Sequence, residues 1–211
     1  MTATPAPAGD DRPLVERARE GRVLTVPNVL SVVRLCSIPV YLWLLFGRDN
    51  RAAAAVLLAA LGSTDWIDGY VARHFDQVTT LGKILDPTAD RLLFFVGVGG
   101  MLVDGSVPVW VAVLTLVREG LVGAAVVGLA MAGARRIDVT WFGKAGTFLL
   151  MVAYPLFLAG ESTLSWRDTA HVLAWVAAVP GLALSYWSAA LYVPLARKAL
   201  REGRAEAAPG A

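Results

Sequence analysis

The stretch from Asp65 to Asp90 reads D-W-I-D-G-Y-V-A-R-H-F-D-Q-V-T-T-L-G-K-I-L-D-P-T-A-D, and it places two pairs of carboxylates inside apolar helical segments. Asp65 and Asp68 are three residues apart and Asp86 and Asp90 are four apart, so each pair shares one face of a helix. Four ionised carboxylates that converge at a membrane boundary repel one another unless a multivalent cation lies among them. The stretch therefore predicts a divalent-metal site with an open face for a phosphate-bearing substrate.

The composition on both sides of this stretch is that of a membrane protein. Of the 211 residues, 56% are hydrophobic and only 17% are charged. A formal net charge of +2 is too small to indicate nucleic-acid binding. The single cysteine, Cys36, excludes a disulfide within the chain.

Apolar segments long enough to cross a bilayer as helices follow one another along the chain. We place them at 28–47, 52–73, 82–103, 107–133, 139–160 and 168–196. The predicted fold is all-α, a polytopic membrane protein with six transmembrane helices and a short N-terminal juxtamembrane helix. We expect a cytoplasmic tail at 1–25 with an amphipathic segment near 13–24, a transmembrane domain at 26–198, and a disordered cytoplasmic tail at 199–211.

The distribution of lysine and arginine predicts the orientation of these helices. One predicted side carries Arg12, Arg17, Arg19, Arg22, Arg73, Lys83, Arg135, Arg136, Arg197, Lys198, Arg201 and Arg204, and the other carries Arg48, Arg51 and Arg167. The first side is therefore expected to be cytoplasmic, with both termini there. At 1.5 Å per residue, Asp65 lies about 20 Å along its helix and Asp86 about 6 Å along the next. The four carboxylates then lie in the cytoplasmic third of the bilayer.

The same residues carry a resemblance to a known family. The pattern Asp65-x2-Asp68-Gly69-x2-Ala72-Arg73-x8-Gly82-x3-Asp86-x3-Asp90 resembles the full signature of the CDP-alcohol phosphotransferase family. The opening Val26–Arg34 resembles that of the bacterial members, and the landmarks at Arg118-Glu119 and Gly143-Lys144 resemble those of the phosphatidylglycerophosphate synthases. The nearest branch is that of the phosphatidylglycerophosphate and cardiolipin synthases. The resemblance covers roughly residues 26 to 195.

The resemblance implies a role for each group of site residues. Asp65, Asp68 and Asp86 would bind Mg²⁺ or Mn²⁺, as two ions, and Asp90 would be the general base that also contacts the second ion. The CDP portion would lie against Asp65, Asp68, Gly69, Ala72, Arg73 and Gly82. The acceptor would bind to Arg118, Lys144, Arg135 and Arg136. A homodimer is also implied.

Several of these residues have a second interpretation. Gly69, Ala72 and Gly82 are also the small residues that membrane helices use for close contact. Arg118 and Glu119 could neutralise each other, and Arg34 is an intramembrane cation that could be structural or functional. Lys144 could extend to the interface.

The resemblance implies that the enzyme transfers the phosphatidyl group of CDP-diacylglycerol to an acceptor hydroxyl and releases CMP. Glycerol 3-phosphate is the acceptor we favour from the sequence, and phosphatidylglycerol, giving cardiolipin, is the alternative. The synthases that use glycerol 3-phosphate commonly carry G-K-x-K-T, whereas this chain has Gly143-Lys144-Ala145-Gly146-Thr147, without the second lysine. A divalent-cation transporter is the alternative from another class.

Overall fold

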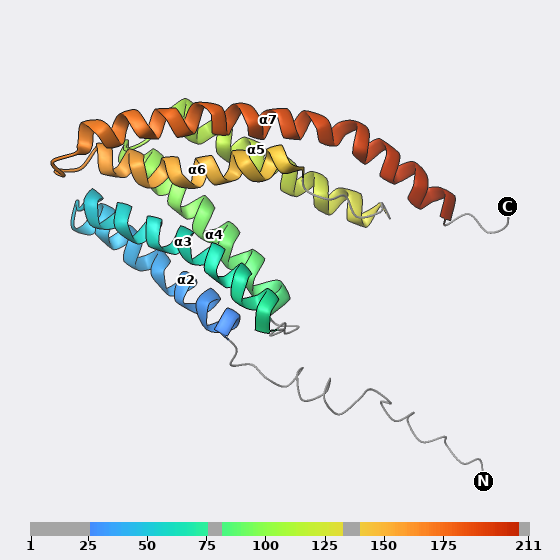
Figure 1. Cartoon of the computed structure of the whole chain (residues 1–211), viewed down its shortest axis with the longest axis horizontal. Helices are drawn as coiled ribbons and strands as arrows, with labels where there is room; N and C mark the ends of the chain where they lie inside the picture. Colours follow the sequence, from blue (N-terminus) through green and yellow to red (C-terminus); the bar gives the residue numbers. More distant parts are fainter. Residues whose placement is uncertain (1–25, 76–81, 133–139, 207–211) are drawn as a thin grey trace, which may run out of the picture.

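The computed structural model describes residues 26–75, 82–132 and 140–206, except for the side chains of residues 26–28, 65–75, 82–87, 193 and 195–206. Within this part every regular element is helical, and Figure 1 shows the helices running back and forth along the molecule. They are α2 (Val26–Leu42), the π-helical turn η1 (Trp43–Gly47), α3 (Arg51–Phe75), α4 (Gly82–Asp104), α5 (Val109–Met131), α6 (Trp141–Gly160) and α7 (Arg167–Glu206).

The predicted all-α fold and its six helical segments are confirmed, with one error at the C-terminal boundary. We predicted a disordered tail from residue 199, whereas α7 continues to Glu206. The extension consists mainly of Ala, Leu, Arg and Glu, which have high helix propensity and so continue a helix beyond the apolar stretch. The predicted amphipathic helix near 13–24 lies outside the described residues.

Four helical stretches in the described part of the chain are long and apolar enough to cross a membrane. They are Val29–Gly47, Val109–Met131, Trp141–Gly160 and Arg167–Tyr192. The described part of α3 contributes a shorter apolar stretch, Arg51–Thr64. The chain is therefore a membrane protein, and the crossings by α3 and α4 stay predictions.

The helices pack as two interlocked groups. Helix α2 contacts α4, α3 contacts α6, and α7 contacts both α5 and α6. The main hydrophobic cluster includes Tyr41, Leu45, Met101 and Phe157, all nearly inaccessible to solvent. These residues lie toward the ends of their helices that are remote from Asp65 and Asp90. The core thus anchors the end of the molecule opposite the carboxylates.

An ion pair joins α3 to α4 at that same remote end. Arg51, the first residue of α3, donates from Nε to Oδ2 of Asp104 at 2.9 Å and from Nη2 to Oδ1 at 3.0 Å. Ser106 also hydrogen-bonds the Asp104 carboxylate. Asp104 is the last residue of α4, so this two-point contact fixes the relative position of the two carboxylate-bearing helices.

Small residues allow α6 and α7 to approach each other closely. At Gly146 an added Cβ would lie 2.6 Å from Ser185 Oγ, 2.8 Å from the Ser185 backbone nitrogen and 2.9 Å from the Gly181 carbonyl oxygen. At Gly143 it would lie 2.7 Å from Ser188 Oγ. Contacts of this kind replace the hydrophobic effect as the force that joins helices in lipid.

Replacing Gly146 with alanine should therefore destabilise the α6–α7 contact. We expect Gly146→Ala to lower the free energy of unfolding by about 1–3 kcal/mol, because the new methyl group meets backbone atoms that cannot rotate away. Thermal unfolding of the purified protein in detergent measures the change. Gly128→Ala is the matched control, since a Cβ there meets nothing within 4 Å. Equal unfolding midpoints for the two variants would contradict the proposed contact.

Candidate functional site

The structure places all four aspartates on two helices that meet at one end of the molecule. Asp65 and Asp68 lie in the second half of α3, and Asp86 and Asp90 lie in the first half of α4. Figure 1 shows that α3 ends and α4 begins at the same end of the molecule. The side chains of Asp65, Asp68 and Asp86 lie outside the description, so their convergence on one point stays a prediction.

Asp90 is the site carboxylate whose side chain the structure describes. Its Oδ1 accepts a hydrogen bond from Nη1 of Arg34 on α2. The Arg34 side chain is 3% exposed and that of Asp90 is 43% exposed. The Asp90 carboxylate therefore meets a buried guanidinium and remains partly exposed.

Arg34 was not among the site residues predicted from the sequence. It is separated from Asp90 by 56 positions, and only the contact between α2 and α4 brings the two together. The available signal was its position as a single cation in the apolar stretch that follows Val26-Pro27-Asn28. A buried arginine needs a compensating anion, and Asp90 supplies one to Arg34.

The predicted nucleotide-binding residues follow the aspartates along the same two helices. Gly69, Ala72 and Arg73 lie on the last turns of α3, and Gly82 is the first residue of α4. Their helical positions are described but their side-chain surroundings are not. The assignment of the CDP portion to these residues therefore stays a prediction.

The predicted acceptor residues are divided among separate elements. Arg118, on α5, is buried and donates from Nη1 to Oε2 of Glu119 at 2.7 Å, so the mutual neutralisation considered from the sequence does occur. Its Nε has no hydrogen-bond partner within the described structure. Lys144 is exposed on the first turn of α6. Arg135 and Arg136 lie outside the described residues, so an acceptor pocket formed by all four stays a prediction.

The donor set fits a hard divalent cation in its chemistry. Carboxylate oxygens are the ligands that Mg²⁺ and Mn²⁺ prefer in proteins. No cluster of three possible ligands occurs among the side chains that the structure describes. Three of the four predicted ligands fall outside that set, so the fit rests on the residue types and their helical positions.

The comparisons with known proteins agree on one family. The model of the CDP-alcohol phosphatidyltransferase family matches residues 24–187. The chain is 36% identical to the cardiolipin synthase (CMP-forming) of Streptomyces coelicolor, over 92% of this chain and 94% of that protein. It is 34% identical to a probable phosphatidylglycerophosphate synthase of Mycobacterium tuberculosis, over 88% of this chain and 86% of that one.

A third relative is named for another activity. The CDP-diacylglycerol–glycerol-3-phosphate 3-phosphatidyltransferase of Rickettsia bellii is 32% identical over 72% of this chain and 87% of its own length. All three relatives are transferases, and this argues against the divalent-cation transporter.

The ion pair between Arg34 and Asp90 should contribute to stability as well as to the site. We expect Arg34→Gln to lower the free energy of unfolding by about 2 kcal/mol, because the amide cannot supply a charge-assisted hydrogen bond to Asp90. Thermal unfolding in detergent again provides the measurement.

Arg48→Gln is the control for this substitution. Arg48 is exposed and its guanidinium carbon lies 5.2 Å from the centroid of the Trp43 ring, a contact worth about 0.5–1 kcal/mol. If Arg34→Gln lost no more stability than Arg48→Gln, the Arg34–Asp90 pair would not support the fold.

Proposed function

Because the chain belongs to the CDP-alcohol phosphatidyltransferase family, we propose that it transfers the phosphatidyl group of CDP-diacylglycerol to a hydroxyl of phosphatidylglycerol and releases CMP. The family uses CDP-diacylglycerol and an alcohol acceptor as substrates, and it generally depends on divalent metal ions. The identity of the acceptor is inferred from residues of this chain.

One observation supports phosphatidylglycerol over glycerol 3-phosphate. Gly146 stands where the G-K-x-K-T motif has its second lysine. A Cβ added there would lie only 2.6 Å from Ser185 Oγ on α7, so even a methyl group does not fit without a shift. A lysine could enter there only if α7 moved away. The phosphate of glycerol 3-phosphate carries close to two negative charges and is best bound by several cations, whereas the phosphodiester of phosphatidylglycerol carries one.

This observation reverses the order of acceptors that we derived from the sequence. Glycerol 3-phosphate remains the second candidate, because two of the relatives described above are named for phosphatidylglycerophosphate formation or for glycerol 3-phosphate. The buried Arg118 and the exposed Lys144 could still bind a phosphate monoester. The two acceptors therefore differ in how many cations they require, and a direct assay separates them.

The reaction itself needs no covalent intermediate on the protein. Asp90 accepts the proton of the acceptor hydroxyl, and the resulting oxygen nucleophile attacks the phosphorus of the phosphatidyl group. A new P–O bond forms while the bond to the CMP phosphate breaks, and CMP leaves with the electron pair. Arg34 positions the Asp90 carboxylate from its buried side.

Asp65, Asp68 and Asp86, with Asp90, would hold the Mg²⁺ or Mn²⁺ ions of the proposal. Two ions bound there would neutralise the charge of the pyrophosphate. Gly69, Ala72 and Gly82 would let the nucleotide approach the helix backbones closely, and Arg73 would face a phosphate.

We also propose an orientation of the protein in the membrane and its assembly as a homodimer. The excess of lysine and arginine at the end that bears Arg73 and Lys83 supports a cytoplasmic position for the site and for both termini. The cytidine nucleotide of CDP-diacylglycerol could then reach the site from the cytoplasm, while the acyl chains of the same lipid lie in the bilayer. The homodimer expected from the family resemblance completes the proposal.

A CMP-release assay tests the acceptor. Purified full-length protein receives CDP-diacylglycerol and Mg²⁺ with phosphatidylglycerol or glycerol 3-phosphate in parallel. We expect turnover with phosphatidylglycerol to exceed turnover with glycerol 3-phosphate at least about tenfold, which corresponds to about 1.4 kcal/mol of discrimination. Faster turnover with glycerol 3-phosphate would show that the cations present suffice for a monoester and would overturn the choice.

Substitution of Asp90 tests the base. We expect Asp90→Asn to lower kcat by about 100-fold or more, because an amide cannot accept the hydroxyl proton, while binding of CDP-diacylglycerol is largely retained. Asp168→Asn, at a fully exposed carboxylate on α7, serves as the control. Turnover of Asp90→Asn at the wild-type rate would remove Asp90 from the mechanism.

A further inference from the structure

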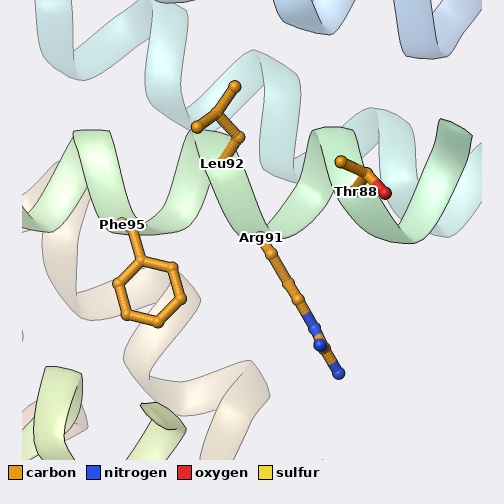
Figure 2. A pocket seen from close by; sticks show the side chains of 4 residues that line it. All are labelled: Thr88, Arg91, Leu92 and Phe95. Carbon is orange, nitrogen blue, oxygen red and sulfur yellow. The ribbon is translucent and has the colours of Figure 1, made fainter. Parts of the chain in front are cut away.

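A shallow hollow of about 370 Å³ lies on α4 next to the site. Thr88, Arg91, Leu92 and Phe95 line it, and all four side chains are exposed (Figure 2). Figure 2 shows the Arg91 and Phe95 side chains projecting to the same side of α4. The lining combines one cation and one hydroxyl with two apolar groups.

Arg91 differs from the other arginines inside these helices. Arg34, Arg51 and Arg118 each form an ion pair with a carboxylate. No salt bridge involves Arg91 in the part of the chain that the structure describes. Its Nη1 would lie 3.9 Å from a Cβ added at Gly123, so the guanidinium reaches the surface of α5 at a glycine.

The position of Arg91 makes its charge costly without an external anion. It is the tenth residue of α4, about 13 Å from the start of the helix, and therefore lies at the depth of the lipid hydrocarbon if α4 spans the bilayer. An arginine at such a depth pairs with an anion or with water rather than with acyl chains. The bilayer itself supplies one suitable anion, the phosphate of a phospholipid.

We propose that this hollow binds the acceptor lipid, with Arg91 on the phosphodiester and with Leu92 and Phe95 against an acyl chain. This inference rests on the proposed function, because it assumes that the acceptor is a phospholipid. Arg91 follows Asp90 directly in α4, and their Cα atoms are therefore about 3.8 Å apart. Successive side chains on a helix project about 100° apart, so a phosphodiester bound at Arg91 lies beside the turn of α4 that carries Asp90, and its glycerol headgroup must extend around the helix to meet the proposed base.

Arg91 could also take the place of a cation that the chain lacks on α6. Gly146 leaves that helix without the second lysine of the related motif, whereas Arg91 offers a positive charge on the exposed surface of α4. A cation there suits an acceptor that approaches through the membrane. A water-soluble acceptor would gain nothing from Leu92 and Phe95, which are 47% and 39% exposed.

Variants of Arg91 test the proposal through lipid binding and kinetics. Arg91→Gln removes the charge, Arg91→Lys keeps it, and Arg167→Gln at the exposed start of α7 is the control. Binding is measured by displacement of fluorescent phosphatidylglycerol from the purified full-length protein in phosphatidylcholine nanodiscs. CMP release at varied mole fractions of each lipid provides KM and kcat.

We expect Arg91→Gln to weaken phosphatidylglycerol binding and to raise its KM about tenfold, since one charge-assisted hydrogen bond is lost. The KM for CDP-diacylglycerol and the kcat should change less than twofold, Arg91→Lys should recover most of the loss, and Arg167→Gln should match the wild type. Unchanged phosphatidylglycerol binding in Arg91→Gln overturns the proposal. An equal rise in the KM for CDP-diacylglycerol also overturns it, because the hollow would then serve the donor.

Two further measurements show whether the site requires the intact lipid and whether the lipid site and the proposed function fail independently. Deacylated glycerophosphoglycerol should compete at least tenfold less well than the intact lipid, and equal competition would overturn a lipid site. If the wild type formed no cardiolipin but Arg91→Gln still lost phosphatidylglycerol binding, the proposed function would fail while the lipid site stood. If cardiolipin formed with the same KM in both proteins, the hollow would be excluded and the function retained.

Discussion

The need to compensate charge inside apolar helices is the constraint on which this structure depends. Arg34 pairs with Asp90, Arg51 with Asp104, and Arg118 with Glu119. Each arginine would be costly in a low-dielectric environment without its carboxylate, and the first two pairs join different helices. The positions of α2, α3 and α4 are therefore determined by charge as much as by packing.

The contacts that hold the helices together and the predicted site residues lie at opposite ends of the molecule. The Arg51–Asp104 contact and the hydrophobic cluster around Tyr41 and Phe157 hold the helices together at one end. The four aspartates lie at the other end, where α3 finishes and α4 begins. Carboxylates that repel one another can be tolerated there because the helices that carry them are fixed elsewhere. A metal site can then form without also having to hold the fold together.

The contact between α6 and α7 bears on the proposed choice of acceptor. Small residues make this contact close, and at Gly146 they also exclude any larger side chain. A position that could carry a cation for a phosphate monoester is thereby used for helix association. Arg91, which forms no salt bridge among the residues that the structure describes, lies on the exposed surface of α4, where we propose that a membrane-resident acceptor binds.

The sequence alone determined the six helical segments, the aspartate quartet and the family, because these depend on runs of apolar residues and on spacing within one or two helices. It did not reveal that Arg34 belongs beside Asp90, that Gly146 is enclosed, or that α7 extends to Glu206. The first two depend on contacts between helices that are distant in the sequence, and no local pattern specifies which faces will meet. The third was missed because polar helix formers at a chain end resemble a disordered tail in composition. Only the tertiary structure decided which charges are paired and which small residues are enclosed.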